Sequence, residues 1–297
     1  MSAPVLMVLA SLLFAGMGVC VKLASAQFNT GEIVFWRGVI GMLFVLSLVR
    51  LRGGTLRTTV PLMHLTRAGV GVTALMLWFW SMSQLPLATA VTLNYMSSVW
   101  MALFLIGGAV LLGASRVDLR LVATVMAGFG GVALVLQPSL APGQAAGALA
   151  GLLSGMVSAL AYLQVTALGR SGEPEYRIVF YFSMGGALAG LAMAWVLGTP
   201  FRGYTPGGAG LLLAIGLLAT SAQMAMTRAY AIGRTLSNAS LQYLGIVFSC
   251  IFGVTLFDDP LTPPALAGML LIIGAGVVAT RLRQQAAADA PDSTADA

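Results

Sequence analysis

An arginine interrupts an apolar stretch near the start of the chain. Arg37 lies in the segment VFWRG, residues 34–38, five residues after Glu32. In a helix that separation is roughly 7.5 Å along the axis. A guanidinium offers a planar fork of donors that fits a carboxylate, so Arg37 is a candidate for binding an anionic group. Alternatively, its long side chain reaches back to the polar boundary of the segment, or bonds carbonyls of a neighbouring helix. The sequence leaves these alternatives open.

A second set of polar side chains occurs twice, in the order hydroxyl, hydroxyl, amide, phenol. The first copy is Thr89, Thr92, Asn94 and Tyr95, and the second is Ser237, Ser240, Gln242 and Tyr243. Residues three apart share a face of a helix, so each copy predicts a hydrogen-bonding stripe, and the two together predict the neutral walls of a cavity. The alternative is that the hydroxyls bond their own backbone or join neighbouring helices. Trp100, near the middle of an apolar run, is a further candidate binding residue.

Several kinds of chemistry are excluded by residue counts. His64 is the only histidine and Lys22 the only lysine, so the chain has no HExxH motif and no GxxxxGK[ST] loop. Cys20 and Cys250 both lie in apolar segments without a CxxC spacing. We therefore predict no catalytic residues, no metal site and no cofactor. A hydrolytic enzyme would have to use His64, which lies at the edge of an expected loop.

The elements that must position these residues are membrane helices. Hydrophobic residues make up 59% of the 297-residue chain and charged residues only 8%, and the mean hydropathy is +0.94. About ten apolar runs follow one another, each close to the ~20 residues that cross a bilayer as a helix. Their centres fall near Phe14, Gly41, Leu75, Trp100, Gly128, Leu153, Ala187, Ile215, Val247 and Ile273. The expected fold is an all-α integral membrane protein.

The basic residues predict the orientation of these helices. If the N-terminus is cytoplasmic, inner connections receive most arginines, as is usual for cytoplasmic loops. The arginines at or near these inner connections are Arg50, Arg52, Arg57, Arg67, Arg116, Arg120, Arg170, Arg177, Arg228, Arg234, Arg281 and Arg283. Both termini are then cytoplasmic. Because these charges are dispersed over short loops, the net charge of +6 does not predict nucleic-acid binding. The expected partners are membrane lipids and a small-molecule substrate.

The two halves of the chain resemble each other. VTLNYMSSVWMALFLIG from residue 91 corresponds to ASLQYLGIVFSCIFGVT from residue 239. This predicts a five-helix repeat over residues 1–143, a second over 144–283, and a disordered cytoplasmic tail over 284–297. Because five is odd, the second repeat must enter the membrane from the opposite face. Such inverted repeats are common in secondary transporters, whose substrate site lies between them.

Several segments of this sequence resemble the drug/metabolite transporter superfamily, EamA type. They are VFWRG, LPLATAVTLNYMSSVWMAL and LGASRVDLRLVATVMAGFGGVALV, with their second-half counterparts, and the resemblance extends to Arg283. Many relatives have LGE where this chain has LGA, so a role for that acidic position does not carry over. The resemblance implies ten helices, a central cavity, transport of small metabolites, often outward, and a bacterial inner membrane.

The combined prediction is a secondary transporter, an exporter or exchanger, that moves a small metabolite such as an amino acid or a related compound by alternating access. No Asp or Glu lies deep in an expected span, which favours facilitated diffusion or exchange over a proton relay and leaves sodium coupling open. Two alternatives are a membrane-embedded enzyme and a membrane subunit that does not transport. The oligomeric state is not predicted.

Overall fold

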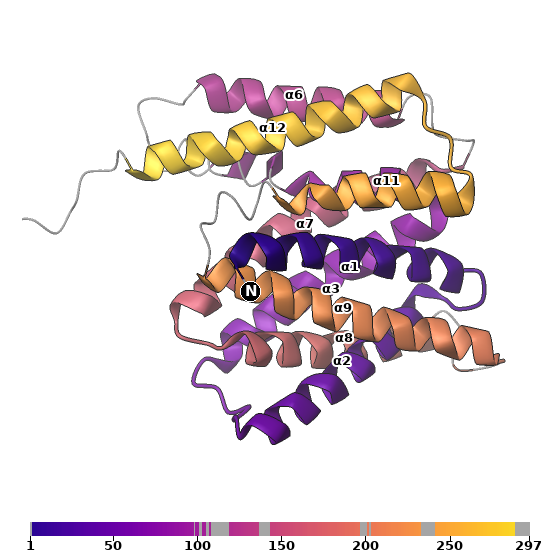
Figure 1. Cartoon of the computed structure of the whole chain (residues 1–297), viewed down its shortest axis with the longest axis vertical. Helices are drawn as coiled ribbons and strands as arrows, with labels where there is room; N and C mark the ends of the chain where they lie inside the picture. Colours follow the sequence, from indigo (N-terminus) through magenta and orange to yellow (C-terminus); the bar gives the residue numbers. More distant parts are fainter. Residues whose placement is uncertain are drawn as a thin grey trace, which may run out of the picture.

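The computed structural model describes residues 2–97, 99–100, 103–104, 107, 119–136, 143–196, 201, 203–232 and 241–288. Within these residues the chain forms ten α-helices and no strands (Figure 1). The helices are α1 (Ala3–Ala24), α2 (Thr30–Arg52), α3 (Pro61–Gln84), α4 (Leu87–Tyr95), α6 (Leu119–Leu136), α7 (Ala145–Arg170), α8 (Glu175–Val196), α9 (Pro206–Ile232), α11 (Leu244–Phe257) and α12 (Pro263–Ala288). Helix α12 ends at Ala288 and so includes the first five residues of the tail expected over 284–297.

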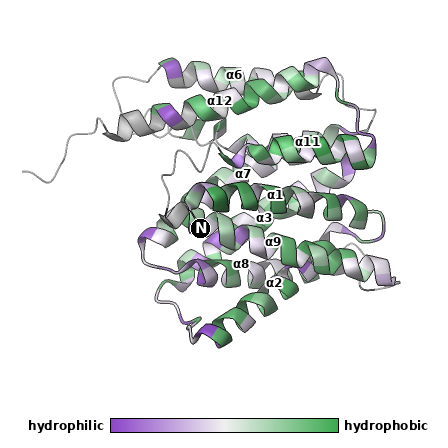
Figure 2. Ribbon diagram, viewed as in Figure 1, coloured by the Kyte–Doolittle hydropathy of each residue, from purple (hydrophilic) through white to green (hydrophobic). Residues whose placement is uncertain are grey.

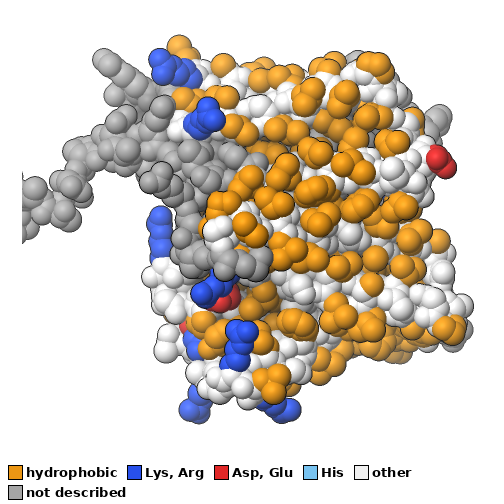
Figure 3. All heavy atoms as spheres, in the orientation of Figure 1, with side chains coloured by type: hydrophobic (Ala, Val, Ile, Leu, Met, Phe, Trp, Pro, Cys, Tyr) orange, Lys and Arg blue, Asp and Glu red, His pale blue; other side chains and the backbone are white. Residues whose placement is uncertain are grey.

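Six described helices are long and apolar enough to cross a membrane. They are α1, α2, α3, α7, α8 and the Pro206–Ala229 part of α9. Figure 2 shows hydrophobic residues along most of their length, and Figure 3 shows a broad apolar surface across the helices. Large apolar side chains such as Leu188 and Leu270 are exposed in the structure. The all-helical membrane fold is therefore confirmed, while the arrangement as ten spans in two inverted repeats stays a prediction.

Both segments that carry the duplicated polar set contain a turn. Helix α4 ends at Tyr95, Met96 adopts a turn, and helical structure resumes at Ser97. In the second segment Leu241 and Gln242 are helical, Tyr243 is a turn residue, and α11 begins at Leu244. The two turns thus fall at the two tyrosines that the sequence comparison aligns, or next to them.

Hydrogen bonds between connections define the two ends of the helix bundle. At one end, Glu32 at the start of α2 accepts a bond from the backbone N–H of Phe201 at 2.7 Å, and Trp36 Nε1 donates to the Tyr204 hydroxyl at 2.8 Å. The start of α2 therefore meets the α8–α9 connection. At the other end, Arg177 in α8 donates to the Thr55 carbonyl at 3.1 Å. The α2–α3 connection therefore meets the start of α8.

The helices pack in pairs that join the two halves of the chain. Helix α2 contacts α8, α1 contacts α9, α3 contacts α7, α4 contacts α11 and α6 contacts α12. The α2–α8 pair is especially close, because Gly38 and Gly190 let the two backbones approach. A Cβ atom at Gly38 would lie 2.6 Å from the Ser183 carbonyl oxygen of α8. Small residues commonly permit this kind of packing between membrane helices.

Candidate binding cavity

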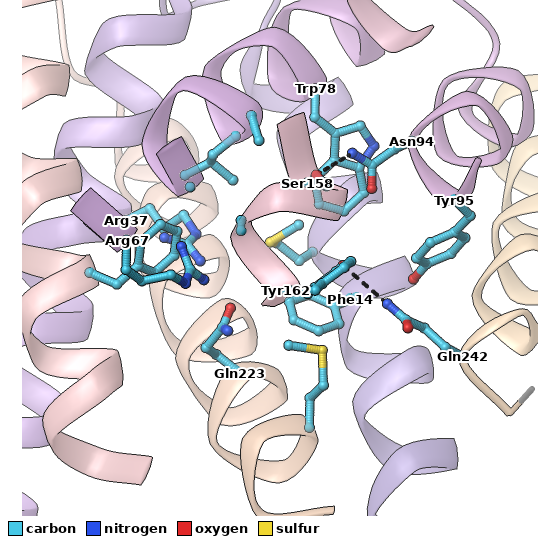
Figure 4. A pocket seen from close by; sticks show the side chains of 17 residues that line it. Phe14, Arg37, Arg67, Trp78, Asn94, Tyr95, Ser158, Tyr162, Gln223 and Gln242 are labelled. Atoms are coloured by element: carbon cyan, nitrogen blue, oxygen red, sulfur yellow. Dashed lines mark hydrogen bonds between the residues drawn. The ribbon is translucent and has the colours of Figure 1, made fainter. Parts of the chain in front are cut away.

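A cavity lies among the helices, with residues from both halves of the chain around it (Figure 4). Its volume is about 70 Å³, which is enough for several water molecules or part of a small solute. Helices α1, α2, α3, α4, α7, α8 and α9 all contribute to its lining, together with Gln242. A site between helices from both halves can respond to a change in their relative position.

Two arginines from different helices point into the same side of the cavity (Figure 4). The guanidinium carbon of Arg37 lies 5.0 Å from the centre of the Phe182 ring, and that of Arg67 lies 4.4 Å from it. Both residues are only 4% exposed. Arg37 Nε and the Nε and Nη1 atoms of Arg67 are buried without a hydrogen-bond partner in the described part of the chain. Neither arginine forms an ion pair with a described carboxylate.

This placement gives the cavity unpaired donors and positive charge. The Phe182 ring offers each guanidinium a cation–π contact, which replaces part of its lost hydration. Buried charges are costly unless they are paired, and in membrane proteins they usually mark a substrate or ion pathway. The arrangement is suited to holding an anionic group.

Neutral hydrogen-bonding groups form another part of the wall. Asn94 Nδ2 donates to Ser154 Oγ at 3.0 Å and to Ser158 Oγ at 3.2 Å. Gln242 Nε2 donates to the Tyr162 hydroxyl at 3.1 Å. These bonds hold amide and hydroxyl groups in fixed orientations at the cavity surface, where they can also bond a polar guest. The apolar part of the lining includes Phe14, Leu75 and Trp78.

Four of the residues proposed from the sequence meet at this cavity. They are Arg37, Asn94, Tyr95 and Gln242. The structure also settles how Arg37 is placed: its side chain is enclosed by protein instead of extending to a polar boundary.

The other proposed residues lie elsewhere. Thr92 is buried and donates to the Ala88 carbonyl at 2.6 Å, as the backbone-bonding alternative expects. Thr89 is also buried without lining the cavity, and Trp100 packs edge-on against Phe129 at 5.1 Å. Tyr243 lies behind the lining, with its ring 6.5 Å from that of Tyr95. Ser237 and Ser240 lie outside the described residues.

Arg67 was expected at or near an inner connection, and the sequence did not single it out as a binding residue. It lies inside α3, two turns after Pro61, and lines the cavity. Proline is favoured in the first turn of a helix, so Pro61 was the signal that the helix begins before Arg67. A further missed signal is the spacing of Ser154, Ser158 and Tyr162, which recur every fourth residue and therefore share one face of α7.

A cluster of polar side chains joins α3 to the α7–α8 connection. His64 Nε2 lies 3.0 Å from Glu173 Oε2, and Thr58 and Arg177 also donate to this carboxylate. The sequence analysis placed His64 at a loop edge, whereas the structure buries it at 2% exposure. Burial raises the pKa of Glu173, but the hydrogen bonds from His64, Thr58 and Arg177 outweigh it, so the net pKa is below the ordinary value of 4.5.

A second cluster lies at the opposite end of α3. Lys22 at the end of α1 pairs with Asp259 at 2.8 Å, and Asp259 also accepts a bond from the backbone N–H of Leu87 at 2.8 Å. Asp259 thereby joins α1, the start of α4 and the connection between α11 and α12. The two clusters hold opposite ends of the bundle, with the cavity between them.

Comparisons with known proteins agree with these observations. The model of the EamA-like transporter family matches residues 1–137 and again 145–281. The pseudopaline exporter CntI of Pseudomonas aeruginosa is 31% identical over 287 residues, covering 95% of this chain and 97% of the relative. An uncharacterized transporter of Helicobacter pylori is 26% identical over 281 residues, 92% of each chain.

A solved crystal structure supports the fold independently of close sequence similarity. It superimposes with a TM-score of 0.65 at 19% identity, and the match covers 95% of this chain and 98% of the other. The relatives and the family are transporters, which agrees with the absence of an enzyme motif in the sequence. The chain belongs to the EamA-like transporter family.

Proposed function

We propose that this protein is a secondary transporter of the bacterial inner membrane that exports a small metabolite, an amino acid or a related compound, by alternating access. The observation that carries the proposal is the cavity lined by both halves of the chain, with two buried guanidinium groups that each keep at least one nitrogen without a hydrogen-bond partner among the described residues. Such donors are expected to bind a guest, because leaving them unpaired in a membrane protein is costly.

The pattern of helix contacts supports two inverted repeats as the basis of the mechanism. If α1, α2 and α3 correspond to α7, α8 and α9, then the α1–α9 contact corresponds to α3–α7, and α2–α9 corresponds to α3–α8. All four contacts are present. The α2–α8 contact corresponds to itself, as expected near a pseudo-twofold axis. A symmetric pair of units can rock between two equivalent arrangements around a fixed site.

The two polar clusters supply contacts that such a motion would break in turn. Opening one end requires the α3 to α7–α8 cluster around Glu173 to separate. Opening the other requires release of Lys22 from Asp259. Each cluster is a small set of charged hydrogen bonds. The free-energy cost of breaking one cluster is offset if the cluster at the other end forms at the same time.

Outward transport is supported by the named relative, an exporter of pseudopaline. Pseudopaline is therefore the first candidate cargo for this chain. Binding and release at a site between two halves need no nucleotide and no cofactor, and lipids supply the surroundings of the apolar surface.

The proposal is tested by flux in proteoliposomes. Purified protein is reconstituted with radiolabelled pseudopaline or amino acids inside, and efflux is compared with protein-free vesicles and with the Arg37→Ala variant. We expect saturable efflux of at least one cargo with the native protein and none with Arg37→Ala at equal abundance. Absence of flux for every cargo, together with a stable protein partner on purification, would favour a membrane subunit that does not transport.

A further inference from the structure

The charge of the cavity narrows the class of substrate. Arg37 and Arg67 contribute two positive charges, and no described lining residue is Asp or Glu. Two cations in a poorly hydrated space repel each other more strongly than in water. A guest that neutralises both is favoured over one that neutralises only one, because the remaining cation would otherwise stay uncompensated.

The positions of the two guanidinium groups allow one small guest to meet both. Each lies within 5.0 Å of the same Phe182 ring, although they come from α2 and α3. Figure 4 shows both side chains ending on the same side of the cavity. Nε of Arg37 and both Nε and Nη1 of Arg67 are buried without a hydrogen-bond partner in the described part of the chain. A guanidinium group is planar and can match the two oxygens of a carboxylate.

The rest of the lining indicates what else the guest carries. Phe14, Leu75 and Trp78 offer apolar contacts that suit a carbon skeleton. Asn94 and Gln242 add neutral groups able to bond an amino, amide or hydroxyl substituent. A carbon skeleton with two carboxylates uses both the cationic and the apolar parts, whereas a phosphate ester carries all its charge on the oxygens around one phosphorus.

We propose that the cavity is selective for small dicarboxylates, and that Arg67 is a specificity-determining residue that acts together with Arg37. This preference is a substrate specificity only if the protein is the transporter proposed above. Binding can nevertheless be measured without flux, so the two proposals are tested separately.

The test is a charge series on one carbon skeleton. Succinate, its monoamide succinamate and the diamide succinamide carry two, one and no carboxylates, and each is titrated calorimetrically into the purified protein in detergent at neutral pH. We expect affinity to fall about tenfold or more for each carboxylate replaced, the usual effect of losing a charged hydrogen bond. Glycerol phosphate serves as the phosphate probe and is expected to bind more weakly than succinate.

Variants then assign the second charge to Arg67. In Arg67→Gln we expect the preference for succinate over succinamate to fall to about threefold or less, while succinamate affinity changes little, because one guanidinium remains for one carboxylate. A general loss of structure would instead weaken both ligands alike. The matched control is Arg228→Gln, which removes an exposed arginine paired with Glu175 at 3.2 Å outside the cavity and should keep the native preference.

Three outcomes would overturn the inference. They are equal binding of the three succinate compounds by the native protein, tighter binding of glycerol phosphate, and an unchanged preference in Arg67→Gln. If Arg67→Gln fails to fold, the inference is tested with the Arg67→Lys variant and with the charge series on the native protein. Clear succinate preference without flux of any cargo would refute the transport proposal alone. Flux of neutral or cationic metabolites without succinate preference would refute this inference alone.

Discussion

At the scale of single residues, Gly71 creates the space that Arg67 occupies. A Cβ atom at Gly71 would collide with Nη1 of Arg67 and would lie 3.0 Å from Phe182 Cε2. Because Gly71 follows Arg67 by four residues on the same helix, the two lie on one face. The glycine therefore fixes where the guanidinium can rest against the ring.

We predict that Gly71→Ala displaces the Arg67 guanidinium and weakens binding of the anionic cargo by about 1 to 3 kcal/mol, the range for a charged hydrogen bond. Ligand affinity measured by calorimetry checks this. Gly69→Ala is the matched control. It makes the same substitution in the same helix, but no atom lies within 4 Å of the added Cβ. Equal affinities in the two variants would contradict the role given to Gly71.

A second residue-scale prediction concerns Glu173, whose pKa is below 4.5 in the folded protein. A depressed carboxyl pKa stabilises the fold at pH values above the unfolded pKa, and this contribution is lost as the pH falls through the folded value. We expect native protein to have a higher melting temperature than Glu173→Gln at pH 7, with the difference shrinking as the pH falls below 4.5. Melting curves in detergent across this range measure it. A difference that does not depend on pH would argue against the charged cluster.

The sequence predicted some cavity residues and missed others for identifiable reasons. Arg37 stands out because its neighbours on both sides are apolar. Arg67 does not, because a charge near the end of an apolar run looks like part of a loop unless the helix start is recognised. Gln223 carries no charge, so nothing in the sequence alone separates its cavity position from an ordinary buried one.

At the scale of elements, apolar run length was sufficient to predict the long helices, because backbone groups in a bilayer must be paired within the helix. The turn at Met96 was not predictable in this way. The segment LNYMSSVW contains neither Gly nor Pro, so no local breaker marks the end of α4. Helix α4 instead packs against both α7 and α11.

The α2–α8 contact gives an element-scale prediction. Gly38→Val places a branched side chain against the α8 backbone, so the two helices must separate, and we expect a loss of about 1 to 3 kcal/mol of stability from overpacking. Thermal unfolding in detergent is the measurement. Gly274→Val in α12 is the control, because no atom lies within 4 Å of a Cβ there. If both variants melt alike, the close approach of α2 and α8 contributes little.

At the scale of the whole molecule, the contacts between connections are what the sequence could not supply. Glu32 and Phe201, or Thr55 and Arg177, are far apart in the chain and carry no mutual signal. Once they are known, the direction of each helix follows. Thr55 follows α2 and Arg177 lies in the first turn of α8, so both mark one end of the bundle. Lys22 and Asp259 mark the other end.

The last prediction concerns which of these ends faces the cytoplasm. Basic side chains gather at one end of the helices in Figure 3, and the positive-inside rule places such an end in the cytoplasm. We expect a reporter fused after Arg283, or inserted near Arg52, to be active only in the cytoplasm, and one inserted near Asp259 only in the periplasm.

A control without an insertion is needed, because an insertion near Asp259 also disturbs its pairing with Lys22. Thiol labelling of an Asp258→Cys variant from outside the cell supplies it without an insertion, provided that Cys20 and Cys250 are first replaced by Ala. If residue 258 is labelled from outside and the Arg283 reporter is active inside, the chain must cross the membrane an odd number of times between the two positions. A single passage of α12 meets this requirement. A periplasmic signal from the Arg283 fusion would instead reverse the predicted orientation.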